Sequence, residues 1–129
     1  MFRYLAPLFL CLTLAADPIV AGKYSGKWEG ASGAPGAFRM TLTSAADGKW
    51  SGEISFTLGG QDVPCTIKVL TVDSAKIHAV YTFDLQGTGL ESTIDGELSG
   101  KKLGGTYKTT VAGDGSAVDE GTWETTASS

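Results

Sequence analysis

The fold is decided by the stretch KIHAVYTFDLQGTGLESTIDGEL, residues 76–98. Two runs in it alternate apolar and polar side chains, and the turn sequence Gly-Thr-Gly, residues 87–89, lies between them. A period of two is typical of a half-buried strand, so the stretch predicts a β-hairpin. We expect its buried face to carry Ile77, Ala79, Tyr81, Phe83, Leu90, Ser92, Ile94, Gly96 and Leu98.

The same period continues outward from this hairpin in both directions. Glycine-rich turns separate the runs, as at residues 47–48, 59–60 and 113–115, and no stretch shows a sustained helical stripe. For the run at 63–71 we expect Val63, Cys65, Ile67 and Val69 on the buried face. The runs predict eight strands, near residues 24–30, 37–43, 49–57, 63–71, 76–83, 90–98, 102–111 and 117–125.

The short connections predict that each strand pairs antiparallel with the next. An open sheet of this kind exposes two edges, and pairing of the first strand with the last removes them. We therefore predict an all-β fold: an eight-stranded antiparallel up-and-down meander barrel, preceded by a signal peptide. The barrel is expected to be a single domain, residues 17–129. A two-sheet sandwich is the alternative, because regular strand spacing fits either architecture.

The first 16 residues have the pattern of a targeting signal. Arg3 provides a positive charge, the apolar run Leu5–Leu14 follows, and Ala15 and Ala16 are small residues suited to a cleavage site. The apolar run is shorter than the roughly 20 residues that span a bilayer. We expect a signal peptide over residues 1–16, a secreted or periplasmic protein and no membrane-spanning segment. Cleavage would leave Cys65 as the single cysteine, so no disulfide is expected within the domain.

Charge and residue counts argue against several function classes. The chain has 10 Lys and Arg against 14 Asp and Glu, without a basic cluster, so nucleic acid is not an expected partner. His78 is the single histidine, and neither a nucleophile motif nor a zinc-binding pattern accompanies it. Glu91, Asp95 and Glu97 share the polar face of one predicted strand, where we expect solvent. We therefore predict no catalytic residue, no metal and no cofactor, and an enzyme is the least favoured class.

A glycine two residues before a large apolar side chain recurs in the predicted strands. Two instances, Gly26 with Trp28 and Gly121 with Trp123, lie in the first and last strands. A Gly-x-Trp at each end of a meander of about eight strands resembles the calycin group of barrels, which includes lipocalins and avidins. The resemblance implies a barrel that holds a small molecule, and it identifies no ligand.

Glycines at 26, 30, 52, 96, 105 and 121 have two interpretations. They allow the strands of a small barrel to curve, or they leave internal volume for a ligand. The second interpretation predicts a pocket at one barrel mouth for a small apolar or aromatic ligand. Its candidate residues are Trp28, Trp50, Tyr81, Ser92, Tyr107, Thr109 and Trp123.

Three function classes follow. We favour a non-enzymatic barrel that binds a small apolar or aromatic ligand. The alternative is an extracytoplasmic interaction or inhibitor-like module that contacts a protein partner through its loops, or a domain with no ligand. A small barrel enzyme is third.

The signal-peptide hypothesis predicts the start of the mature chain. Because cleavage is expected after Ala16, N-terminal sequencing of the natively exported protein should begin near Asp17. An exported product that begins at Met1 would contradict the hypothesis.

Overall fold

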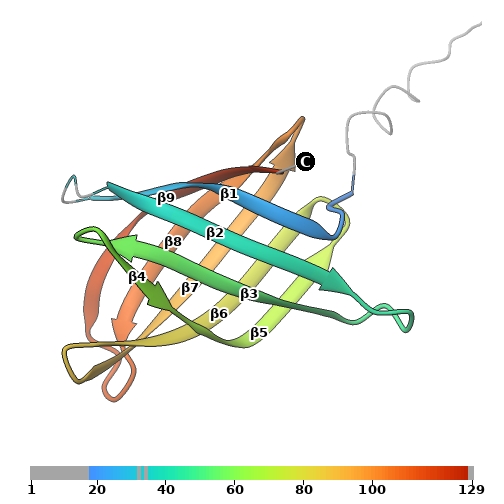
Figure 1. Cartoon of the computed structure of the whole chain (residues 1–129). Coiled ribbons are helices and arrows are strands. Elements are labelled where there is room, and N and C mark those ends of the chain that lie inside the picture. Colours follow the sequence, from blue (N-terminus) through green and yellow to red (C-terminus); the bar gives the residue numbers. More distant parts are fainter. Residues whose placement is uncertain (1–17, 32, 34, 128–129) are drawn as a thin grey trace, which may run out of the picture.

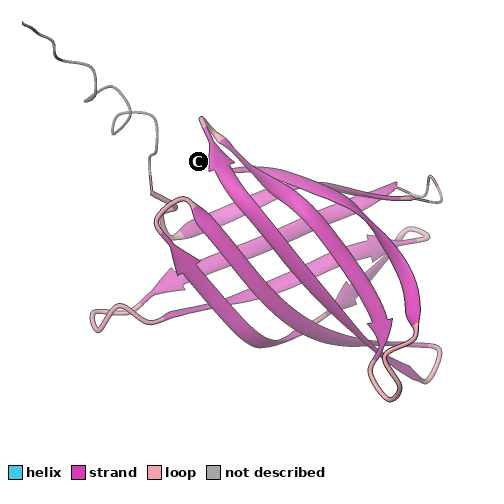
Figure 2. Ribbon diagram, turned by 180° about the vertical axis from the view of Figure 1, so that it is seen from behind, coloured by secondary structure: helices cyan, strands magenta, loops and turns pink. Residues whose placement is uncertain are grey.

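The computed structural model describes residues 18–31, 33 and 35–127 and places nine antiparallel strands among them (Figures 1 and 2). Residues 1–16, where the signal peptide is predicted, lie outside the described residues. The strands are β1 (Gly22–Gly30), β2 (Pro35–Ser44), β3 (Trp50–Leu58), β4 (Gln61–Pro64), β5 (Thr66–Asp73), β6 (Lys76–Leu85), β7 (Thr88–Ser99), β8 (Lys102–Val111) and β9 (Ala117–Ala127).

All nine strands belong to one sheet, in the order β4-β3-β2-β1-β9-β8-β7-β6-β5. The first strand pairs with the last, and Trp28 of β1 lies opposite Trp123 of β9. The two edge strands, β4 and β5, follow each other in the chain, and β3 packs beside β5. The sheet therefore curls into a nearly closed antiparallel barrel, which confirms the predicted all-β barrel (Figure 2).

Nine strands form rather than eight because the predicted strand at 63–71 is divided at Cys65. A β-bulge follows between Ile67 and Val69, where the pairing with β6 shifts by one residue. A bulge reverses the alternation of side chains, so Leu70 lies opposite buried Ala79 whereas Val69 is 44% exposed. The prediction that Val69 faces the core is therefore wrong, because alternation alone does not reveal a bulge.

Apolar side chains fill the end of the barrel where β1 begins. Ile19, in the segment before β1, is buried there, and its backbone N–H donates to the carbonyl oxygen of Ser74 at 2.8 Å. The hydroxyl of buried Tyr24 donates to the carbonyl oxygen of Val20 at 2.6 Å. These two hydrogen bonds hold the segment that precedes β1 against this end of the barrel, on the right in Figure 1.

The strand glycines allow neighbouring backbones to approach closely. A Cβ atom on Gly26 would lie 2.7 Å from the Cα of Thr125, and one on Gly121 would lie 2.9 Å from the Cα of Gly30. Gly96 lies beneath the ring of Trp123, whose Cζ2 would be 2.5 Å from a Cβ atom there. These positions support the interpretation that glycine serves curvature and ring packing.

We predict that Gly121→Ala destabilises the fold by at least about 2 kcal/mol, because the methyl group would overlap the carbonyl oxygen of Glu29. Gly113→Ala is the matched control, since a Cβ atom at Gly113 meets nothing within 4 Å. Urea-induced unfolding of both variants and the parent measures the difference. Equal stability of Gly121→Ala and Gly113→Ala would contradict this role of glycine.

Candidate functional site

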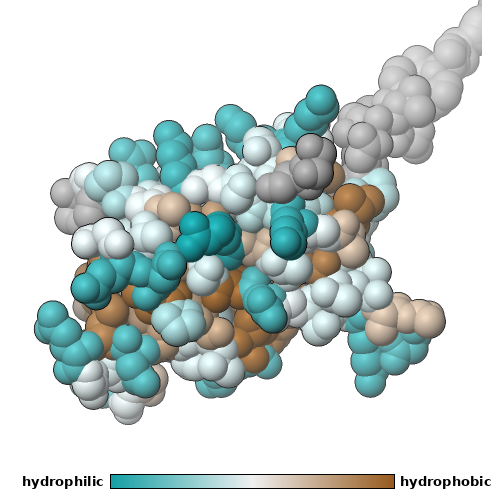
Figure 3. Space-filling model, viewed as in Figure 1, coloured by the Kyte–Doolittle hydropathy of each residue, from teal (hydrophilic) through white to brown (hydrophobic). Residues whose placement is uncertain are grey.

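A cavity of about 170 Å³ lies inside the barrel at the end opposite Ile19. Its rim includes Leu58 at the end of β3, Leu85 at the end of β6 and Val118 near the start of β9. Leu58 is 37% exposed and Val118 is 50% exposed, so the cavity opens to solvent between these strand ends. Apolar residues also reach the surface beside β3 and β5, where Figure 3 shows brown atoms between teal ones.

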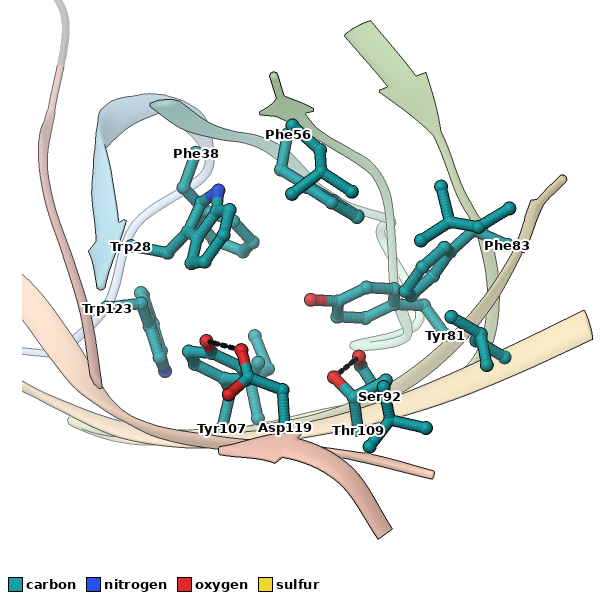
Figure 4. A pocket seen from close by; sticks show the side chains of 15 residues that line it. Trp28, Phe38, Phe56, Tyr81, Phe83, Ser92, Tyr107, Thr109, Asp119 and Trp123 are labelled. Carbon is teal, nitrogen blue, oxygen red and sulfur yellow. Dashed lines mark hydrogen bonds between the residues drawn. The ribbon is translucent and has the colours of Figure 1, made fainter. Parts of the chain in front are cut away.

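Aromatic rings form one wall of the cavity (Figure 4). Trp28 meets Phe56 edge to face, with ring centroids 6.1 Å apart, and Phe56 meets Phe83 in the same way at 4.9 Å. Phe38 packs against Trp123 with centroids 5.4 Å apart. Contacts of this kind hold each ring in place by its neighbours.

Both tryptophans of this wall already use their polar atoms. The indole N–H of Trp28 donates to the carbonyl oxygen of Thr57 at 3.0 Å, and that of Trp123 donates to the carbonyl oxygen of Thr106 at 3.0 Å. A ligand in the cavity therefore meets the carbon atoms of the two indoles. This wall provides apolar contact and shape rather than hydrogen bonds.

Polar groups lie on the side of the cavity that β7, β8 and β9 form, which also carries Trp123. The hydroxyls of Ser92 and Thr109 form a hydrogen bond of 2.5 Å, and both residues are buried. The hydroxyl of Tyr107 donates to Oδ2 of Asp119 at 2.8 Å. Figure 4 shows both pairs facing the rings across the cavity.

The phenol groups of the cavity stay protonated far into the alkaline range. Burial raises the pKa of Tyr81, the nearby Cys65 thiol adds to the shift, and a hydrogen bond with Ser92 opposes it. Burial also raises the pKa of Tyr107, and its hydrogen bond to Asp119 acts in the same direction. Both hydroxyls are therefore neutral near neutral pH.

Six of the seven candidate residues line this one cavity: Trp28, Tyr81, Ser92, Tyr107, Thr109 and Trp123. Trp50, at the start of β3, is half-buried and does not line it. Four residues outside the candidate set also line the cavity: Phe38, Phe56, Phe83 and Asp119. The sequence pattern could have indicated Asp119, because it lies at alternate positions with Gly121 and Trp123 along one strand and so shares their face.

The groups considered for catalysis lie apart from the cavity wall. Nδ1 of His78 is 2.6 Å from Oδ1 of Asp95, and both side chains are substantially exposed to solvent. Glu91 forms an exposed ion pair with Lys68, with 3.0 Å between Nζ and Oε1. Among residues 18–127 that the structure describes, no three His, Cys, Asp or Glu side chains gather as metal ligands would.

No helix in the described part of the chain is both long and apolar enough to cross a membrane. Comparison with protein-family models, curated proteins and solved structures found no match to this chain.

We predict that Cys65 reacts slowly in the folded protein. Burial raises the pKa of its thiol to about 12, so the folded chain holds less thiolate than the unfolded chain at any pH below that value. At about pH 8, iodoacetamide should alkylate Cys65 at least about tenfold faster in urea than in buffer, measured by peptide mass spectrometry. Equal rates would contradict burial of the thiol.

Proposed function

We propose that the barrel binds one small, mainly aromatic or apolar molecule in the cavity and performs no reaction on it. The observation that carries this proposal is the cavity itself, whose aromatic wall has its indole N–H groups already bonded to backbone. Close packing normally fills such a space, because a void loses dispersion contacts on every side. An apolar ligand would restore those contacts.

The size of the cavity limits the ligand. Apolar protein cavities of about 150 Å³ take up benzene, and the volume here is about 170 Å³. One aromatic ring with a short substituent matches that space. Because the cavity opens between Leu58, Leu85 and Val118, a longer substituent would extend into solvent.

The polar pairs on β7, β8 and β9 would orient the ligand. Pockets for small molecules are mostly apolar and carry a few polar groups that fix the direction of binding. Tyr107 with Asp119, and Ser92 with Thr109, fit that description because they face the aromatic wall.

The setting that we propose is that of an exported, calycin-type barrel. Pairing of the first strand with the last and the two Gly-x-Trp positions support this relationship. Cleavage after Ala16 is compatible with the fold, because Ile19 would remain on the mature chain. Ile19 is buried at the barrel end opposite the cavity.

Binding of a single-ring probe tests the proposed function. Phenethyl alcohol should change the tryptophan emission saturably, because Trp28 and Trp123 line the cavity. Val118→Phe should weaken this binding at least about tenfold, because Val118 lines the cavity and the larger side chain would occupy volume that the ligand fills. Val69→Phe is the matched control, since Val69 is similarly exposed and does not line the cavity.

Isothermal titration calorimetry measures the same dissociation constants without relying on fluorescence. An unchanged affinity in Val118→Phe would place the probe elsewhere. Absence of saturable binding for phenethyl alcohol, toluene and phenethylamine would overturn the proposed function.

A further inference from the structure

The cavity has an uneven distribution of charge. Asp119 is the one carboxylate among its lining residues, and no Lys, Arg or His lines it. The one side-chain partner of Asp119 within the described residues is the neutral hydroxyl of Tyr107, 2.8 Å from Oδ2. A negative charge therefore faces an apolar space without an opposite charge.

The cavity that Asp119 lines gives a ligand group access to this carboxylate, and Gly30 of β1 packs closely against its other side. A Cβ atom on Gly30 would lie 2.7 Å from Oδ2 and 3.3 Å from Oδ1 of Asp119, and 3.0 Å from the hydroxyl oxygen of Tyr107. Glycine at this position therefore keeps a side chain away from both oxygens. Tyr107 occupies Oδ2 through its hydrogen bond, so acceptor capacity remains on Oδ1.

A carboxylate in this position discriminates between ligands by their charge. A neutral ligand would displace water from Asp119 and leave the charge poorly compensated, which is unfavourable. An anionic ligand would add repulsion. A protonated amine would replace the lost water with charge-assisted hydrogen bonds.

The nearby rings favour the same class of ligand. The ring of Trp28 lies edge to face with that of Tyr107, with centroids 6.0 Å apart and an interplanar angle of 88°. Because the two rings lie at right angles, ring faces as well as ring edges border the cavity. The face of an aromatic ring attracts a cation. Asp119 and these rings border the same cavity (Figure 4).

We propose that the cavity selects a small aromatic amine in its protonated form, an inference that rests on the proposed binding function. The aromatic ring of the ligand lies against Trp28, Phe38 and Trp123. Its ammonium group donates a hydrogen bond to Asp119 at the polar wall.

Three probes of one size and different charge test this selectivity. Phenethylamine is a cation at neutral pH, phenethyl alcohol is neutral and phenylacetate is an anion. We expect phenethylamine to bind the parent at least about tenfold more tightly than phenethyl alcohol, and phenylacetate to bind more weakly than either.

Asp119→Asn separates charge from shape, because asparagine keeps an acceptor for Tyr107. It should weaken phenethylamine binding at least about tenfold and should not weaken phenethyl alcohol binding, because a neutral ligand no longer leaves a charge uncompensated. Asp84→Asn is the matched control: it removes the same charge from an exposed residue of β6 near the same barrel end, and Asp84 does not line the cavity. It should change phenethylamine less than about twofold.

The outcomes separate the two proposals. Equal binding of phenethylamine and phenethyl alcohol to the parent would overturn the selectivity and leave the binding function intact. A preference for phenethylamine that persists in Asp119→Asn would overturn the role of Asp119. Binding of none of the three probes, nor of toluene, would overturn both proposals. Thermal unfolding followed by circular dichroism checks that each variant is folded.

Discussion

The pairing of β1 with β9 is the interaction on which the rest of the structure depends. It joins the beginning of the barrel to its end and places Trp28 directly opposite Trp123. Without this ladder, the strands from β1 to β4 and those from β5 to β9 would be two separate sheets, each with exposed edges. The inner wall of the cavity draws residues from both groups, so the cavity exists only when this ladder is formed.

This pairing also explains why so many glycines lie in strand interiors. Gly26 and Gly121 belong to the two paired strands, and each lies where a neighbouring backbone leaves no room for a methyl group. Glycine in a strand lowers its intrinsic stability. Here the close approach of the backbones lets the sheet curve tightly. The curved sheet buries the large rings of Trp28, Phe38 and Trp123, and this burial of apolar surface stabilises the fold.

Much of the fold could be predicted from the sequence, because most strands follow strict alternation between turns. The hairpin at 76–98 forms with Ile77, Tyr81 and Ile94 buried as expected, although its turn is Gln86-Gly87 rather than residues 87–89. The run at 63–71 was not predicted fully, because the adjacent apolar residues Val69 and Leu70 fit either face, and the bulge where β5 meets β6 decides that Leu70 faces inward.

The candidate site could likewise be predicted only in part. Alternation assigned Trp28 and Trp50 alike to the inside of the barrel, yet it contains no information on height along the barrel axis. Trp50 begins β3, at the end where Ile19 is buried, and Trp28 lies near the end of β1, so only Trp28 reaches the cavity. Asp119 was not among the candidate residues although it shares the alternation of Gly121 and Trp123, and its pairing opposite Thr109 places it on the inner face of the barrel.

The interruption between β4 and β5 has a further consequence for the protein in concentrated solution. Each of these strands has one side without a ladder partner, and such an edge can recruit a strand from another molecule. β4 has only four residues and ends with Pro64, which has no N–H to donate. β5 carries the exposed charge of Lys68 at its bulge. A short strand, a proline, a bulge and a lysine are features that discourage edge-to-edge aggregation, and here all four lie on the two edge strands of the sheet.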